Sequence, residues 1–282
     1  MPFAAGIHYS FHEGDDVRRP PVILIHGAGG NQLYWPPEVR RLAGYGRAVT
    51  YHYGSTVGYH YGSAVGYHYR VFALDLPGHG KSSGIGLQSI RDYARSVVNF
   101  MDAVGLWRAV IVGHSMGGAI ALTLALDHAE RVAGLGLIGT GARLRVAQIL
   151  LDNTANAATF SLAVQMINEW AFGPQADPHL KALAAKRMAE TRPAVLHGDL
   201  LACDAFDVMD RLSEIRVPTL VLCGTEDKLT PLTYSKTLAS QIPGAALQTV
   251  DGAGHMVMLE EPRRVAGALT VFLKTVPYTP GK

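Results

Sequence analysis

The sequence predicts an α/β fold with a mostly parallel central sheet flanked by helices. Short continuous apolar runs that end in glycine-rich loops recur along the chain, and they are typical of strands buried on both faces. Longer segments with apolar residues at spacings of three and four lie between them and indicate helices. A strand–turn–helix junction surrounds Ser115. Strands that alternate with helices favour parallel pairing through right-handed crossovers.

The individual elements follow in chain order. Alternation over residues 7–13 predicts an edge strand, and the amphipathic segment 88–104 predicts a helix that Gly105 ends. An apolar helix should run from the Ser115 turn to about residue 128, and the last helix should span 261–274. Strands are expected at 21–25, 70–74, 109–112, 135–138, 217–222 and 246–250.

Residues 142–212 interrupt this alternation. They are rich in Ala, Leu, Met and Glu and contain no clear buried strand, so we expect a helical cap inserted between two strands of the sheet. Such a cap would cover the carboxyl ends of the strands, where open α/β sheets bind ligands. The predicted organisation is a core formed by 1–141 and 213–282, with the cap at 142–212 between them.

Three copies of an eight-residue unit occupy residues 45–68 (YGRAVTYH, YGSTVGYH and YGSAVGYH). Removing them leaves an uninterrupted helix-to-strand connection, so we interpret the segment as a tandem expansion within a surface loop, without a catalytic role. Two alternatives stay open. Its aromatic face could pair with a second subunit and give a homo-oligomer, or a meander could align three histidines that bind a metal adventitiously (His52, His60 and His68).

Composition narrows the function classes. Hydrophobic residues make up 48% of the chain and the formal net charge is +2, without a basic block, so nucleic-acid binding is not expected. Two cysteines, Cys203 and Cys223, do not indicate a disulfide framework. No signal peptide and no run of about 18 apolar residues is evident, so we expect a soluble cytoplasmic protein without a membrane partner.

The pattern Gly113-x-Ser115-x-Gly117 predicts a nucleophile elbow, because it lies between a buried strand and a helix. Such a sharp turn projects the serine hydroxyl above the sheet, and it crowds the positions two residues to either side. The helix that follows favours negative charge at its N-terminus. An oxyanion site needs two N–H donors, which we assign to the backbones of Met116 and Ala28.

Position along the chain selects the partners of the serine. Of twelve histidines, His255 follows the last predicted strand in a glycine-rich loop, where a general base should lie. The orienting carboxylate should follow the preceding strand, and we assign it to Asp227, with Glu226 as the alternative. The order serine, acid, histidine is the one expected of this type of site.

With these motifs the chain resembles the α/β-hydrolase superfamily, in its group of small carboxylesterases and enol-lactonases with a helical cap. The resemblance spans nearly the whole chain in matching order, and the repeat at 45–68 departs from the family pattern without touching the motifs. It implies serine chemistry, because dehalogenases and epoxide hydrolases of this fold carry an aspartate where Ser115 stands. The motifs are His26-Gly27, the 75–82 loop, Gly113 to Gly118, Gly224 to Asp227 and Gly254-His255.

We therefore predict a serine carboxylesterase that cleaves neutral esters of short to medium acyl chains. No cofactor or metal is expected, since no Gly-x-Gly-x-x-Gly follows the first strand and no His/Cys cluster has zinc-like spacing. The alternatives are a lactonase, a C–C bond hydrolase or a perhydrolase on the same residues, or a ligand receptor with little turnover. Five residues either line an apolar pocket or form core (Trp35, Phe160, Met166, Trp170 and Phe172).

Overall fold

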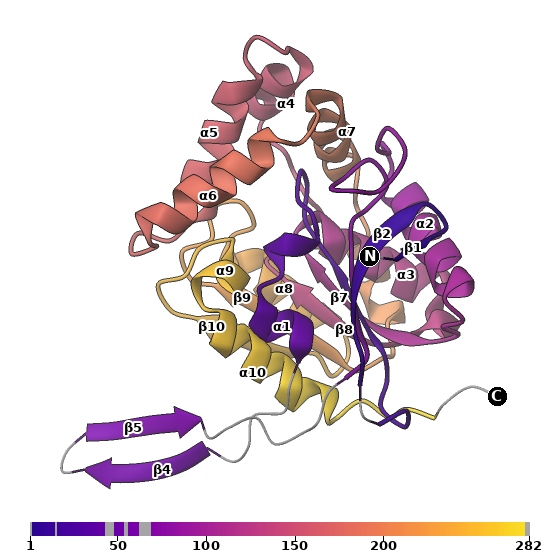
Figure 1. Cartoon of the computed structure of the whole chain (residues 1–282), viewed down its shortest axis with the longest axis vertical. Coiled ribbons are helices and arrows are strands. Elements are labelled where there is room, and N and C mark those ends of the chain that lie inside the picture. Colours follow the sequence, from indigo (N-terminus) through magenta and orange to yellow (C-terminus); the bar gives the residue numbers. More distant parts are fainter. Residues whose placement is uncertain (1, 15, 43–47, 54–55, 62–68, 280–282) are drawn as a thin grey trace.

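An eight-stranded sheet forms the centre of the molecule in the computed structural model, which describes residues 2–14, 16–42, 48–53, 56–61 and 69–279 (Figure 1). The strand order is β1-β2-β6-β3-β7-β8-β9-β10, and all neighbours from β6 to β10 are parallel. The predicted fold class is confirmed. The strands are β1 (Phe3–Ala4), β2 (Ile7–His12), β3 (Val22–Ile25), β6 (Val71–Leu74), β7 (Ala109–His114), β8 (Val132–Ile138), β9 (Thr219–Gly224) and β10 (Ala246–Val250).

The strand order reverses at β3, which lies between β6 and β7. The loops that leave the carboxyl ends of β3 and β7 therefore flank one crevice, the position at which open α/β sheets bind ligands. These two loops approach each other closely, because a Cβ built on Gly27 would lie 3.0 Å from the Cβ of Ser115. The topology thus brings the predicted oxyanion loop to the predicted nucleophile.

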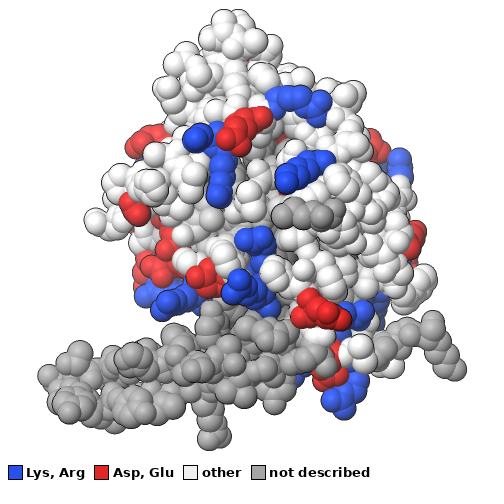
Figure 2. All heavy atoms as spheres, viewed as in Figure 1, with Lys and Arg blue, Asp and Glu red and all other residues white. Residues whose placement is uncertain are grey.

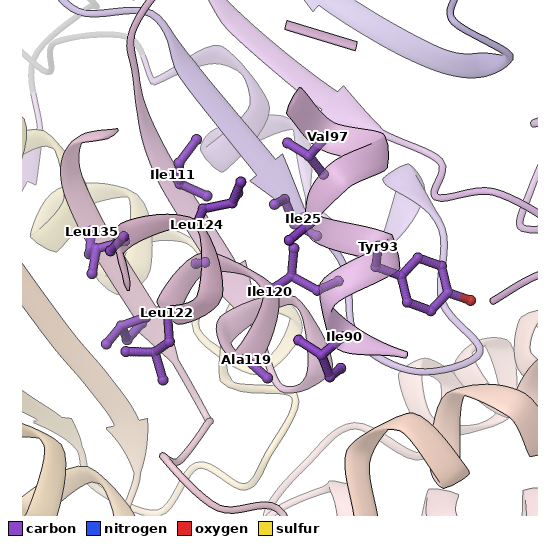
Figure 3. Packing of buried hydrophobic residues seen from close by; sticks show 14 of the residues in the cluster. Ile25, Ile90, Tyr93, Val97, Ile111, Ala119, Ile120, Leu122, Leu124 and Leu135 are labelled. Atoms are coloured by element: carbon purple, nitrogen blue, oxygen red, sulfur yellow. The ribbon is translucent and has the colours of Figure 1, made fainter. Parts of the chain in front are cut away.

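Helices cover both faces of the sheet, since successive residues of a strand point to opposite sides. Ile25 and Ile111 pack with α2 and α3 in one core (Figure 3), whereas Val22 and Leu24 pack with α1 and α10 in the other. The side chain of Ser89 caps α2 by accepting a hydrogen bond from the amide of its third residue. These helices are α1 (Pro37–Arg41), α2 (Ile90–Ala103), α3 (Met116–Asp127), α8 (Leu232–Gln241), α9 (Val257–Glu260) and α10 (Pro262–Leu273).

Four helices between β8 and β9 form a separate layer above the sheet (Figure 1). They share an apolar core that includes Leu150, Val164 and Leu196. No helix of the described residues is both long and apolar enough to cross a bilayer. The helices of this layer, which we call the cap helices, are α4 (Gln148–Ala155), α5 (Phe160–Ala171), α6 (Pro178–Ala189) and α7 (Pro193–Asp204).

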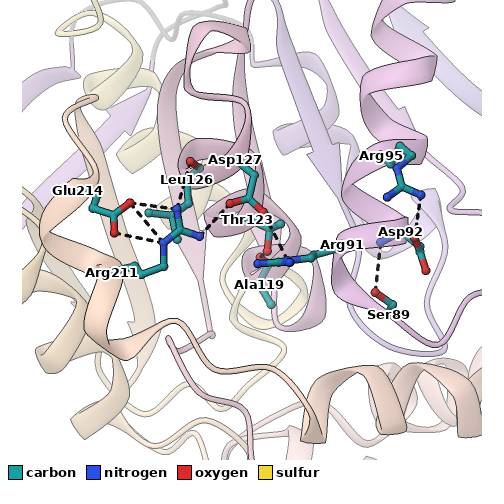
Figure 4. Close-up of polar contacts among 10 residues, drawn as sticks. All are labelled: Ser89, Arg91, Asp92, Arg95, Ala119, Thr123, Leu126, Asp127, Arg211 and Glu214. Carbon is teal, nitrogen blue, oxygen red and sulfur yellow. Dashed lines mark hydrogen bonds and ion pairs between the residues drawn. The ribbon is translucent and has the colours of Figure 1, made fainter.

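An ion cluster ties the segment that returns from the cap helices to the helices on the sheet (Figure 4). Arg211, in the short helix η3 (Met209–Glu214), donates to Asp127 at the end of α3 over 2.8 Å. It also pairs with Glu214 at 3.0 Å, and Arg91 of α2 lies 3.5 Å from Asp127. Charges of both signs are interspersed over the face shown in Figure 2. Exposed pairs of this kind each add about 0–1 kcal/mol, so the cluster fixes position more than it adds stability.

The tandem repeat contributes a separate two-stranded antiparallel sheet, formed by β4 (Ala48–Tyr53) and β5 (Thr56–Tyr61). Its register pairs His52 with Val57 and Val49 with His60. The alternative that the repeat histidines align across strands is therefore not met by His52 and His60, because the register does not pair them with each other. His68 lies outside the described residues.

Candidate active site

The Ser115 backbone is strained in the way that the glycine pattern predicts. Ser115 joins β7 to α3 with φ 53° and ψ −120°, a conformation that costs a non-glycine residue about 1–3 kcal/mol. A Cβ at Gly113 would overlap the carbonyl of Gly117, and a Cβ at Gly117 would overlap the carbonyl of Ile25. The turn is held by a 3.0 Å hydrogen bond from the Ser115 amide to the Ile138 carbonyl. Only glycine fits at the positions two residues before and two residues after the serine.

His255 and Asp227 are brought together at the ends of β10 and β9. The Nδ1 of His255 lies 2.9 Å from Oδ2 of Asp227, and both residues are buried. The other Asp227 oxygen, Oδ1, accepts from the amides of Leu229 and Thr230, at 2.9 and 2.8 Å. The Thr230 hydroxyl donates to Oδ2 over 2.8 Å. Burial raises the pKa of Asp227, but attraction to His255 and the hydrogen bonds from His255 and Thr230 outweigh it, so the net pKa is lowered and the carboxylate is ionised near pH 7.

Thr230 is a part of this site that the sequence did not reveal. Its hydroxyl lies 2.8 Å from Asp227 Oδ2 and 3.1 Å from His255 Nδ1. A single threonine after an acidic residue carries no recognisable pattern, so only the folded loop shows the contact. The alternative acid, Glu226, is exposed, whereas Asp227 is buried against His255.

Ser115 and His255 line the same cavity. Among the described residues, no hydrogen bond joins the Ser115 hydroxyl to the His255 ring, whose Nδ1 is occupied by Asp227. Such bonds are commonly long in a site without substrate and tighten in the complex. His114, which precedes the serine, is excluded as a base. Its Nε2 donates to the His255 carbonyl at 3.0 Å, and burial, together with repulsion from His255, lowers its pKa to about 3.

Two backbone N–H groups are available for an oxyanion. Neither the Ala28 nor the Met116 amide meets an acceptor within the described ranges. His26 fixes the loop that carries Ala28, because its Nε2 accepts from the Leu76 amide at 3.1 Å and its Nδ1 donates to the Gly27 carbonyl at 2.8 Å. Burial and the nearby His79 lower the His26 pKa to about 4, so the ring is neutral near pH 7.

The cavity above Ser115 has a volume of about 190 Å³. Typical sites for drug-sized ligands measure about 300–1,000 Å³, so this one suits a small ligand. Its wall is mostly apolar and comes largely from the cap helices and the loops beside them. The apolar lining includes Leu144, Val146, Leu150, Ile167, Trp170, Met188, Leu196, Leu200, Leu229 and Met256.

Of the five side chains predicted for the pocket, the structure brings Trp170 to the cavity. Trp35 and Phe172 are instead buried in the core between the sheet and α10, and Phe160 and Met166 pack within the cap. For the residues of α5 the physical reason is helix geometry. Residues spaced by three or four share a face, but the sequence does not say whether that face meets the cavity or another helix.

Two cations, Arg145 and Lys228, also line the cavity. Arg145 donates to the Asp204 carbonyl at 3.0 Å and lies 3.8 Å from Asp207. The exposed Lys228 ammonium has no acidic partner in the described part of the chain. The cavity wall therefore carries one cation beside a carboxylate, Arg145, and one without an acidic partner among the described residues, Lys228.

Glu260 of α9 holds the loop that carries His255. Its two carboxylate oxygens accept from the amides of Gly254 and Gly173, each at 2.9 Å. Gly173 follows α5, so this carboxylate links the histidine loop to the end of a cap helix. Burial raises the pKa of Glu260 despite these two bonds.

Comparison with known proteins agrees with this architecture. A family model described as "alpha/beta hydrolase fold" matches residues 20–262. A Caulobacter vibrioides protein named "Putative carbamate hydrolase RutD" is 28% identical over 290 residues, which cover 95% of this chain and 96% of that protein.

Two solved structures superpose on nearly the whole chain. A thermophilic esterase is 32% identical with a TM-score of 0.73, and the match covers 97% of this chain and 100% of that one. The enol-lactonase of Burkholderia xenovorans LB400 has a TM-score of 0.81 at 24% identity, over 97% and 100% of the two chains, which shows the shared fold. The chain therefore belongs to the alpha/beta hydrolase fold family.

Proposed function

We propose that this protein is a serine carboxylesterase that hydrolyses small esters through an acyl-enzyme, with Ser115, His255 and Asp227 as its catalytic residues. The observation that carries the proposal is the convergence of a strained, cavity-facing serine with a buried His255–Asp227 pair at 2.9 Å. The 32% identical thermophilic esterase supports ester chemistry.

The proposed reaction has two halves. The Ser115 Oγ attacks the ester carbonyl carbon while His255 Nε2 takes its proton, and the oxyanion accepts hydrogen bonds from the Ala28 and Met116 amides. The C–O bond then breaks, and His255 returns the proton to the departing alcohol. Water next attacks the acyl-serine, His255 takes its proton, and the carboxylic acid leaves with Ser115 restored.

Asp227 has an electrostatic part in these steps. Its carboxylate accepts from Nδ1 of His255, which fixes the tautomer that leaves Nε2 free to accept the serine proton. It also stabilises the imidazolium that forms in each half-reaction. The three hydrogen bonds that Leu229 and Thr230 donate keep this buried carboxylate ionised and oriented.

The test is turnover of p-nitrophenyl esters from acetate to palmitate by the wild type and Ser115→Ala. We expect serine-dependent turnover with an optimum at short acyl chains, because the cavity holds only about 190 Å³. Ser240→Ala is the control, since Ser240 is exposed on α8 and bonds only within its own helix. Equal turnover by wild type and Ser115→Ala would overturn the proposal.

A carbamate is a second candidate, because the Caulobacter relative at 28% identity carries that name. A p-nitrophenyl carbamate series belongs in the same experiment, since the same serine would attack its carbonyl. Faster turnover of carbamates than of esters with matched leaving groups would move the assignment from ester to carbamate hydrolysis.

A further inference from the structure

A second buried carboxylate crosses the boundary between the cap helices and the core. Asp199 lies on α7, yet its side chain, which is 0% exposed, reaches down to three core groups. Oδ2 accepts from the Gly29 amide at 2.9 Å and lies 2.7 Å from Nε2 of His79. Oδ1 accepts from the Tyr93 hydroxyl at 2.6 Å, and this hydroxyl points away from the apolar cluster in Figure 3. A buried charge is costly unless it is fully paired, so this arrangement needs an explanation.

The counter-ion of Asp199 is His79. Both ring nitrogens of His79 face acceptors, with Nε2 at Asp199 and Nδ1 3.1 Å from the Pro77 carbonyl, so both carry hydrogen and the ring is an imidazolium. The other titratable groups around it are His26, with ring centroids 4.8 Å apart, Tyr93 at 6.2 Å and the nearby Asp75 carboxylate. Burial lowers the His79 pKa, but the two carboxylates and the carbonyl outweigh it and raise the pKa overall.

The cap helices and their connections hold Gly29 from three sides. Asp199 accepts its N–H, and the Thr191 hydroxyl, between α6 and α7, donates to its carbonyl at 2.8 Å. Gly29 has φ +63°, a conformation that favours glycine, and a Cβ there would lie 2.9 Å from Cδ1 of Leu196, so the loop packs closely against α7. Gly29 directly follows Ala28, whose N–H is a proposed oxyanion donor. Asp199 and Thr191 thus each hold one of the two peptide groups that flank Gly29, and the Gly30 amide adds a bond to the Gly27 carbonyl at 3.1 Å within the loop.

We propose that Asp199 is a positioning residue for the Ser115 reaction, which fixes the Gly29 amide and thereby holds the Ala28 N–H where the oxyanion forms. The inference rests on the proposed function. It means that the docking of α7 adds to the hold of His26 on the oxyanion loop, so the cap helices contribute to the rate as well as to the shape of the cavity.

The test is Asp199→Asn, which keeps the size of the side chain and removes its charge. Removing one oxyanion donor outright lowers kcat by about 10²–10³-fold, so a displaced donor should lower kcat by about 10–100-fold. The rate is measured per active site titrated by the p-nitrophenol burst, so that unfolded protein does not count. We expect KM to change less than about threefold, because the donor acts on the transition state. The Ki of a trifluoromethyl ketone, whose serine adduct carries an oxyanion, should rise in parallel with the loss in kcat/KM.

Thr191→Val is the second variant, because it removes a hydrogen bond to Gly29 without leaving a buried charge unpaired. We expect kcat per titrated site to fall about 3–10-fold, as for one weakened hydrogen bond. Its matched control is Thr154→Val, since the Thr154 hydroxyl bonds within the cap, to the Leu150 carbonyl and His197.

The outcomes separate this inference from the proposed function. Wild-type kcat and Ki per titrated site in both Asp199→Asn and Thr191→Val would overturn the positioning role. A loss confined to the number of titratable sites would also overturn it, by showing a purely structural role. Turnover that survives Ser115→Ala would instead remove the proposed function itself.

Discussion

Two of the buried histidine–carboxylate pairs in this molecule, His255–Asp227 and His79–Asp199, differ in what the second ring nitrogen of the histidine contacts. In the pair His255–Asp227, Nδ1 binds the carboxylate at 2.9 Å, and the histidine lines the cavity. In the pair His79–Asp199, Nε2 binds the carboxylate at 2.7 Å, Nδ1 faces a carbonyl, and neither residue lines the cavity. The first pair leaves a ring nitrogen able to accept a proton, whereas the second leaves none.

The difference shows that a histidine next to an aspartate is not sufficient for base catalysis. The second ring nitrogen decides, because a histidine that donates from both nitrogens is a fixed positive charge. Accordingly, we propose that the first pair performs the chemistry and that the second holds α7 and the oxyanion loop together. Substitutions in the pair His255–Asp227 should therefore lower turnover more than stability, and substitutions in the pair His79–Asp199 should lower stability more than turnover.

The largest expected effect is on turnover by substitutions of the two histidines. His255→Gln should lower kcat by about 10⁴–10⁶-fold, because no other group takes the serine proton. His79→Gln should lower it by no more than about 100-fold, through the displaced oxyanion loop. Both are measured with p-nitrophenyl acetate per folded molecule, with His128→Gln at the end of α3 as the control. Similar losses of kcat in His255→Gln and His79→Gln would contradict the proposal that only the first pair performs the chemistry.

The next effect is on the free energy of unfolding. Asp199→Asn should lower it by about 3–5 kcal/mol, because the fully buried His79 loses its counter-ion. The double variant His79→Gln/Asp199→Asn should recover part of this loss, because no unpaired charge remains. Urea denaturation followed by circular dichroism gives both values. A double variant less stable than either single variant would show that the pair acts through packing and not through charge.

The two pairs should also respond to pH in opposite directions. The His79 pKa is raised above 6.5, so its contribution to stability is full below about pH 6.5 and is lost as pH rises through the raised pKa. The Asp227 pKa is lowered below 3.8, so its contribution is present above about pH 3.8 and is lost as pH falls through the lowered pKa. The difference in Tm between wild type and His79→Gln/Asp199→Asn should therefore shrink with rising alkaline pH. A difference independent of pH between 6 and 10 would contradict the ion pair.

The smallest expected effect concerns Lys228, a cation of the cavity wall. For a p-nitrophenyl ester with a carboxylate at the far end of its acyl chain, Lys228→Met should raise KM up to about fivefold relative to a neutral ester. A change in KM of this size corresponds to the weak attraction, about 0–1 kcal/mol, between exposed charges in water. Lys236→Met on α8 is the control, because Lys236 does not line the cavity. A KM ratio that Lys228→Met leaves unchanged would show that Lys228 does not meet the substrate.

The sequence predicted those parts of the molecule that depend on order along the chain. Buried strands are marked by apolar runs, and the residues that follow them collect at one edge of a parallel sheet, so Ser115, Asp227 and His255 could be assigned without coordinates. The helix α8 was missed, because only Ser235 and Leu238 of its residues are buried and the apolar pattern is weak.

The contacts that depend on how the cap helices pack on the core could not be predicted from the sequence. Asp199 has no sequence pattern that distinguishes it from other acidic residues of a helix. It is separated from Gly29 by 170 residues in sequence, so their hydrogen bond could not be predicted. Trp35 and Phe172 were assigned to the pocket by residue type, but the choice between core and cavity is made by packing across elements. Periodicity reports which face of a helix is apolar and not what that face contacts.

The most direct test of the central claim is to map the adduct of a fluorophosphonate by mass spectrometry of peptides from the labelled protein. We expect one phosphonyl group on Ser115 in the wild type and in Ser240→Ala, labelling slowed at least about 10³-fold in His255→Gln, and none in Ser115→Ala. An adduct on another residue, or labelling of Ser115→Ala at the wild-type rate, would contradict the claim that Ser115 is the nucleophile.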